Sequence, residues 1–173
     1  MNKTHKFLIR RRKKMIFKDL PLIFGIAGVA RCGKDTLGKH LIYKLNRLGF
    51  PAMHFSFAME LKRDLDPFLK DKLNISAFTD VNSEKELIRP MLVCWGTDVC
   101  RKLDPDFWIK KIEKQVKSSI NNKIIVVITD VRYENEAKWI KDNGGYLIHL
   151  SRMGLKPSNF QGKIERSNHQ ETC

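Results

Sequence analysis

The sequence lacks the features that mark several special classes of protein. No apolar run approaches the roughly 20 residues that cross a bilayer. The charged N-terminus is not followed by the apolar segment and small-residue cleavage site of a secretory signal. The four cysteines form no CxxC pair, so they indicate reduced thiols and neither a disulfide framework nor a zinc site. We therefore expect a cytoplasmic protein without membrane contact.

Charge is distributed unevenly along the 173 residues, which have a formal net charge of +14. Residues 1–14 contain many of the basic side chains and no acid. Such a run is typical of a solvated, disordered arm, and a nucleic-acid-binding arm is the alternative, with weak contact at most. We predict a basic arm over residues 1–14 and one folded domain over residues 15–173. The remaining positive charge suits a protein that handles phosphorylated molecules.

Short apolar segments alternate with amphipathic ones, which predicts an α/β fold with a parallel sheet flanked by helices. The run IIVVIT is β-branched throughout, as in a strand buried on both faces. We expect Pro67 to interrupt the helix after the second strand, and Ser83 with Glu86 to form a capping box that opens the next helix. The expected strands cover residues 22–27, 52–57, 123–129 and 146–150.

The stretch GVARCGKDT, residues 28–36, has the G-x-x-x-x-G-K spacing of a phosphate-binding loop. An apolar strand precedes it and an amphipathic helix starts at Lys34, so backbone amides and the positive helix end converge on one point. Gly28 and Gly33 let the backbone curl, and Lys34 neutralises phosphate charge. We prefer this interpretation to a plain glycine-rich turn. The expected nucleotide-binding residues are Gly28, Arg31, Cys32, Gly33, Lys34, Asp35 and Thr36.

Asp35 stands where phosphate-binding loops usually have a hydroxyl. A carboxylate beside a polyphosphate is tolerable only if it faces Mg²⁺, the waters of the metal or another cation. Small kinases of the adenylate kinase type carry G-K-G-T with the same offset of the threonine, so we expect Thr36 to meet a phosphate oxygen. Asp130 ends the IIVVIT strand, where a carboxylate is the usual partner of the metal. The alternative is that Asp130 caps the following helix, and both roles are compatible. The expected magnesium ligands, in part through water, are Asp35, Thr36 and Asp130.

Basic and aromatic residues in the second half predict phosphate and acceptor contacts. Arg132 could approach a transferring phosphoryl group, whereas Glu136 could equally form a surface salt bridge. Trp95 could stack on a base, although core packing explains it at least as well. Arg152, after the last strand, is expected to contact phosphate or adenine. The expected acceptor-binding residues are Phe57, Ala58, Lys62, Arg89, Trp95 and Arg101.

Five motifs occur in order: G-x-x-x-x-G-K-D-T, S-F-A-x-x-L-K, W-G-T-D-x-x-R, D-P-D-F-W and I-T-D-V-R-Y-x-N-E-A. Over residues 22–152 the chain resembles the deoxynucleoside monophosphate kinase family of tailed bacteriophages. The resemblance implies an adenylate-kinase-like P-loop fold, with a lid and substrate region at about 62–104. It also implies transfer of phosphate from Mg-ATP to a deoxynucleoside monophosphate for DNA precursor synthesis, in the host cytoplasm if a phage encodes the chain. The implied catalytic residues are Lys34, Arg101, Asp130 and Arg132.

The end of the sequence departs from the pattern of that family. Relatives carry a His-x-Ser-Glu-like stretch before a further strand and helix, whereas SNHQET has His169 and Glu171 in another order. This departure predicts a truncated product or one piece of a split gene. A non-catalytic nucleotide- or nucleic-acid-binding protein therefore stays an alternative, as does a P-loop kinase for another small phosphorylated metabolite. The base preference and the oligomeric state stay open, a homodimer included.

Overall fold

The computed structural model describes residues 21–154, so the predicted arm (1–14) and the stretch with His169 and Glu171 lie outside the described residues. Four parallel strands form one sheet in the order β2-β3-β1-β4, with β3 and β1 in the centre. This arrangement confirms the predicted α/β class. The strands are β1 (Ile23–Ala27), β2 (Ala52–Phe55), β3 (Ile125–Val131) and β4 (Tyr146–His149).

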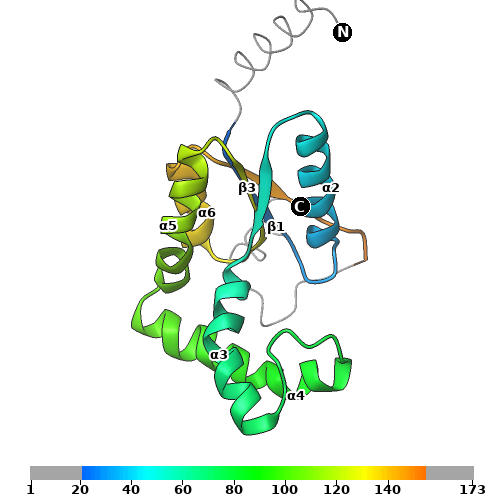
Figure 1. Ribbon diagram of the computed structural model, residues 1–173, viewed down its shortest axis with the longest axis vertical. Helices are drawn as coiled ribbons and strands as arrows, with labels where there is room; N and C mark the ends of the chain where they lie inside the picture. The colour runs from blue at the N-terminus through cyan, green and yellow to red at the C-terminus, as the bar shows by residue number, and fades with distance from the viewer. Residues whose placement is uncertain (1–20, 155–173) are drawn as a thin grey trace, which may run out of the picture.

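Helices cover both faces of this sheet and extend past one end of it (Figure 1). On one face lies α2, and on the other lie α5 and α6, while α3, α4 and η1 form a helical half beyond the carboxyl ends of the strands. Within the described range, no helix has the length and apolar character needed to cross a membrane. The helices are α2 (Lys34–Arg47), α3 (Phe57–Leu73), α4 (Asn82–Val93), the π-helix η1 (Cys94–Arg101), α5 (Phe107–Asn121) and α6 (Glu134–Asp142).

The core is built around β3. Residues 125–128 of this strand are completely buried, because their side chains alternate between two apolar clusters. One cluster joins the sheet to α5 and α6 through Ile112 and Ile140, and the other joins it to α2 through Leu45. Burying each such aliphatic side chain contributes about 1.5–3 kcal/mol. The β-branched run therefore occupies the doubly covered strand that its sequence predicts.

The second strand is shorter than predicted. It ends at Phe55, and Phe57 and Ala58 are the first two residues of α3, so they are not strand residues. The backbone amides of both residues donate to the carboxylate of Asp130, which supplies the N-terminal cap of α3 from another strand. A cap contributed from so far along the chain leaves no local signal in the sequence.

Two expectations about the helical half are wrong. Pro67 lies inside a continuous α3, because side chains on both sides of it, Leu65 and Leu69, pack into one apolar cluster. The capping box is not formed either: α4 begins at Asn82, so Ser83 already lies in the helix. The hydroxyl of Thr79 instead donates to the carboxylate of Glu84 and orders the residues before α4.

Candidate active site

The loop between β1 and α2 has the backbone of a phosphate cradle. Gly28 has φ 142°, and a Cβ atom there would lie 2.1 Å from the carbonyl oxygen of Leu150, so no other residue fits without moving the backbone. Gly33 and Arg31 also have positive φ, of 104° and 65°. The amide of Leu37 donates to the carbonyl of Gly33 at 2.9 Å, which closes the first turn of α2. The loop thus ends on a helix N-terminus, as predicted from its spacing.

Lys34 is held inside this loop. Its side chain is buried, with 9% of the residue surface exposed, and its ammonium donates to the carbonyl oxygens of Gly28 and Val29, the latter at 2.6 Å. The thiol of Cys32, also buried, lies 4.0 Å from the same nitrogen. An ammonium has three protons, so a phosphate in the cradle has a cation already in place.

Thr129 joins the end of β3 to the first turn of α2. Its hydroxyl donates to Oδ1 of Asp35 at 3.0 Å and lies 2.8 Å from Nε2 of His54, at the end of β2. Sequence reasoning identified neither His54 nor Thr129. A signal existed for Thr129, because it precedes Asp130 at the carboxyl end of the core strand. His54 belongs to no motif, and only the pairing of β2 with β3 brings it here.

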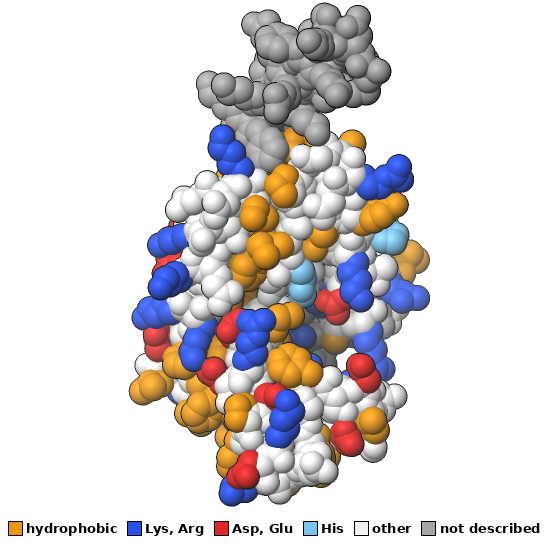
Figure 2. Space-filling model, in the orientation of Figure 1, with side chains coloured by type: hydrophobic (Ala, Val, Ile, Leu, Met, Phe, Trp, Pro, Cys, Tyr) orange, Lys and Arg blue, Asp and Glu red, His pale blue; other side chains and the backbone are white. Residues whose placement is uncertain are grey.

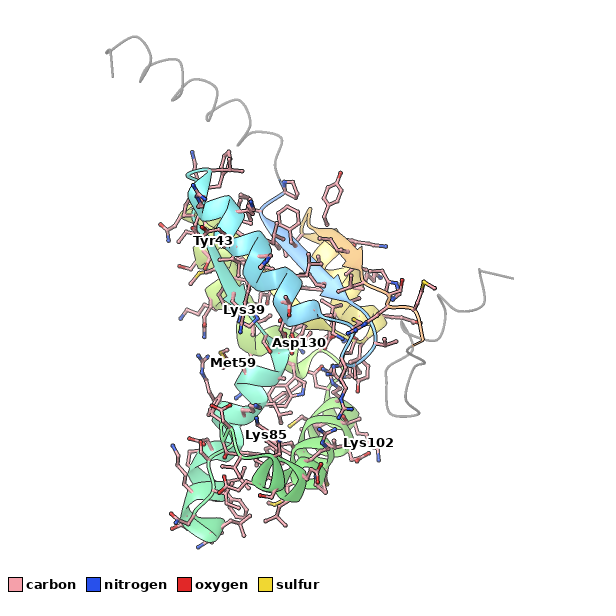
Figure 3. All side chains as sticks on the ribbon, turned by 90° about the vertical axis from the view of Figure 1, so that its right-hand side faces the viewer. Lys39, Tyr43, Met59, Lys85, Lys102 and Asp130 are labelled. Atoms are coloured by element: carbon pink, nitrogen blue, oxygen red, sulfur yellow. The ribbon has the colours of Figure 1, made fainter. Side chains whose placement is uncertain are left out.

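Asp130 lies between the starts of α2 and α3 (Figure 3). Its carboxylate accepts hydrogen bonds from the hydroxyl of Ser56 at 2.8 Å and from the amides of Phe57 and Ala58 at 3.0 Å and 2.7 Å. Asp130 therefore caps α3, whereas the alternative from sequence was the helix that follows it, α6. A carboxylate has about four lone-pair sites, so one further ligand can still bind.

The carboxylates of Asp35 and Asp130 suit a metal that arrives with a nucleotide. In the part of the chain that the structure describes, no three His, Cys, Asp or Glu side chains form a metal-binding group. Mg²⁺ in kinases needs only one or two carboxylates, because phosphate oxygens and waters complete its octahedron. Asp35 stands beside Thr36 at the start of the helix, and among residues 21–154 its Oδ2 has no hydrogen-bond partner. The donor set therefore fits a phosphate-bound Mg²⁺ and does not resemble a closed protein cage.

Arg101 and Glu136 form a buried ion pair. Glu136 is completely buried, which corrects the expectation of a surface salt bridge. One of its oxygens accepts from the guanidinium of Arg101 at 2.6 Å, and the other accepts from the amides of Arg132 and Tyr133 at 2.8 Å and 3.1 Å. The guanidinium also lies 3.9 Å from the ring centroid of Tyr133. Burial raises the pKa of Glu136, and the charge of Arg101 opposes that shift. Arg101 thus holds the loop that carries Arg132.

The remaining predicted residues differ in the exposure of their side chains and in the contacts that these side chains make. Trp95 is 37% exposed, so it is not the core residue that its sequence suggested, and Trp108 fills the core instead. The ammonium of Lys62 lies 5.6 Å from the centroid of the Phe78 ring. Within residues 21–154, no hydrogen bond or ion pair holds the side chains of four exposed arginines. These arginines are Arg31, Arg89, Arg132 and Arg152.

The segment before Arg152 lies beside the loop between β1 and α2. The amide of Leu150 donates to the carbonyl of Ala27, which brings the residues just before Arg152 next to the start of the loop. Figure 2 shows the surface hollowed between the half that contains the sheet and the helical half, with basic and acidic side chains around the hollow. This arrangement can hold a polyphosphate at the loop and a second anion on the side of the helices.

Known proteins provide a second line of evidence. A family model described as phosphomevalonate kinase matches residues 26–145, from β1 to the turn before β4. The chain belongs to this family of P-loop kinases. A protein of Acanthamoeba polyphaga mimivirus is named "Putative deoxynucleotide monophosphate kinase". It is 30% identical to the present chain over 153 residues, which cover 78% of this chain and 76% of the relative.

Membership of the family confirms the coarse prediction that the chain is a kinase, and therefore a phosphotransferase that uses a nucleotide. The kinase carries the whole loop around Lys34, together with Asp130 and the pair of Arg101 and Glu136, within the matched residues. The two comparisons name different acceptors, a phosphorylated metabolite and a deoxynucleotide. Both names refer to acceptors that are anions ending in a phosphate group.

Proposed function

We propose that this kinase transfers the γ-phosphoryl group of ATP to a deoxynucleoside monophosphate, which yields the deoxynucleoside diphosphate and ADP. An oxygen of the acceptor phosphate forms the new bond to phosphorus, and the bond to the β-phosphate oxygen of ATP breaks. Such a reaction provides precursors for DNA synthesis. The five sequence motifs and the name of the mimivirus relative support this acceptor.

The observation that carries the proposal is the juxtaposition of the loop and the end of β3. The hydroxyl of Thr129 bonds to Asp35 in the first turn of α2, and the next residue, Asp130, caps α3. A donor phosphate chain on the loop is therefore adjacent to the strand that leads into the acceptor side. Phosphoryl transfer needs mainly such positioning and charge neutralisation, with no nucleophile from the enzyme.

On the donor side, Lys34 and the loop amides bind the β- and γ-phosphates. The ammonium of Lys34 donates two of its three protons to the carbonyl oxygens of Gly28 and Val29, and a phosphate oxygen can accept the third when ATP arrives. Arg31 and Arg152 are exposed at the two segments that meet beside Gly28 and can bind phosphate or adenine. Mg²⁺, when bound with ATP, neutralises charge on the β- and γ-phosphates, and Asp35, Thr36 and Asp130 would hold it directly or through water.

On the acceptor side, side chains are the groups expected to bind the monophosphate. The amides of Phe57 and Ala58 are occupied by Asp130, so the roles of these two residues are limited to shaping the pocket. Lys62, Arg89 and Arg132 supply cationic groups. Trp95, which is partly exposed, can stack on a base. Closure of the helical region at about 62–104 would exclude water, which otherwise competes as the acceptor.

A coupled assay of ADP release from Mg-ATP tests the proposal. The acceptors are the deoxynucleoside monophosphates, one at a time, and phosphomevalonate, the acceptor that the family description names. Lys34→Met keeps the apolar stem of the side chain but removes its charge, and it provides the blank. We expect release that depends on a deoxynucleoside monophosphate and falls on the order of a hundredfold or more in Lys34→Met. Release with phosphomevalonate alone would assign the second acceptor instead.

Deletion of the basic N-terminal residues distinguishes the proposed kinase activity from a function in nucleic-acid binding. We expect a protein that lacks residues 2–14 to keep the acceptor-dependent ADP release of the full chain. A protein that binds DNA or RNA through the arm would lose that binding on deletion, and the binding by the full chain would fall steeply with salt concentration.

A further inference from the structure

We propose that Thr129 and His54 are positioning residues that fix the carboxylate of Asp35 for the complex of metal and nucleotide. This inference rests on the proposed function, because it assigns the partners of an already proposed metal contact. Its basis is a continuous chain of hydrogen bonds from β2 through β3 to α2, formed by His54, Thr129 and Asp35.

The direction of the two bonds follows from the groups involved. A hydroxyl has one proton, and a carboxylate can only accept. Thr129 therefore donates its proton to Oδ1 of Asp35. The contact of 2.8 Å between Thr129 and His54 then requires Nε2 of the imidazole to donate. Both hydrogen bonds are thus donated in the same direction, from His54 to Thr129 and from Thr129 to Asp35, and each bond polarises the next.

Packing fixes the middle of this chain. Thr129 is 2% exposed, and its γ-methyl group lies against α2 at Gly38, where a Cβ atom would come within 2.3 Å of that methyl carbon. The close approach of α2 to β3 therefore needs glycine at residue 38. With the methyl group held there, the hydroxyl has no freedom to turn away from Asp35. The hydrogen bond is built into the contact between helix and strand.

Asp35 itself needs such a restraint. Its side chain is exposed at the start of α2, next to the place where the loop amides and Lys34 gather phosphate charge. A free carboxylate would be repelled and would rotate toward solvent. The bond from Thr129 holds one oxygen toward β3 and leaves Oδ2 for the waters around a metal. Fixing the carboxylate beforehand removes an ordering cost from the binding of the metal.

Four variants isolate this role. Thr129→Val keeps the shape and burial of the side chain but lacks the hydroxyl, and Thr129→Ser keeps the hydroxyl. His54→Ala removes the donor at the far end of the chain. His40→Ala is the matched control, because His40 is exposed on α2 and has no partner among the described residues.

Binding of Mn²⁺ by the protein with AMP-PNP, followed by electron paramagnetic resonance, gives a readout that needs no turnover. We expect Thr129→Val to weaken Mn²⁺ binding about tenfold or more, the order expected from losing one hydrogen bond to a charged group. The loss in His54→Ala should be smaller, since the Thr129 bond persists. Thr129→Ser keeps the hydroxyl but lacks the methyl group that holds it, so its loss should be smaller than that of Thr129→Val. His40→Ala should match the wild type. The affinity for AMP-PNP without metal should change in none of them.

Three results would overturn the inference. They are wild-type Mn²⁺ binding in Thr129→Val, equal loss in Thr129→Val and Thr129→Ser, and equal loss of AMP-PNP affinity with and without metal. In steady-state assays the expected change is a higher Mg²⁺ requirement at unchanged KM for the acceptor. Absence of acceptor-dependent turnover in the wild type would count against the proposed function, whereas the Mn²⁺ titration would still decide the role of Thr129.

Discussion

Removing the guanidinium of Arg101 should destabilise the protein, because the buried carboxylate of Glu136 then has no cationic partner. Glu136 is completely buried, and Arg101 is its cationic partner at 2.6 Å. Truncating one member of a buried ion pair costs about 3–5 kcal/mol, because the other charge stays uncompensated. The two backbone amides that bind the second oxygen of Glu136 remain in Arg101→Ala and reduce this cost. We therefore expect a loss in the free energy of unfolding of about 3 kcal/mol at neutral pH.

The loss should depend on pH in a defined sense. Burial raises the pKa of folded Glu136 above its unfolded value, and the charge of Arg101 is the largest opposing effect. Arg101→Ala raises the folded pKa further. A raised pKa of an acid gives stability that is present below the unfolded pKa and lost as pH rises through the folded pKa. The variant should therefore be closer to the wild type at about pH 5, near the unfolded pKa, than at about pH 8.

Urea unfolding followed by tryptophan fluorescence measures both effects. The double variant Arg101→Ala with Glu136→Gln removes the charge along with its partner, so we expect it to be more stable than Arg101→Ala at about pH 8 and to lack the added pH dependence. An equal loss at both pH values, together with a double variant no more stable than Arg101→Ala, would refute the reasoning. The electrostatic account of the pair would then be wrong.

Three other changes test separate contacts. Gly38→Ala places a methyl group against Thr129, so unfolding in urea should show a loss of about 1–3 kcal/mol, and an unchanged midpoint would argue against the tight packing. Asp130→Asn weakens the cap of α3 and should cost about 1–3 kcal/mol, with an unaltered midpoint as the contrary result. A hydrogen bond from Lys70 holds the pKa of Asp66 low. The melting temperature of Asp66→Asn should therefore fall below that of the wild type at neutral pH, and the gap should close below about pH 4. A gap that is the same at both pH values would contradict that role.

The parts of the protein that are predicted best from the sequence are those whose conformation depends on neighbouring residues alone. The β-branched run of β3 and the spacing of Gly28, Gly33 and Lys34 specify their own conformation, and the structure has both as expected. The end of β2 could not be placed, because Asp130 caps α3 from a strand more than 70 residues away. No local propensity encodes a contact of that kind.

The misplaced side chains have the same cause. Glu136 is charged and lies in a polar stretch of the sequence, so nothing local indicates that it is fully buried against Arg101. Trp95 begins the W-G-T-D-x-x-R motif and Trp108 ends the D-P-D-F-W motif, yet only Trp108 is buried in the core. His54 and Thr129 meet only because β2 pairs with β3. Such contacts depend on strand order, which a single sequence does not specify.

Transfer of a labelled phosphoryl group tests the central claim most directly. The protein is incubated with Mg-ATP labelled at the γ-phosphate, together with a mixture of deoxynucleoside monophosphates and phosphomevalonate, and the labelled products are separated by chromatography. The account predicts label in a deoxynucleoside diphosphate, and none with Lys34→Met. Label confined to diphosphomevalonate, or to inorganic phosphate, in a protein shown to be folded would contradict it.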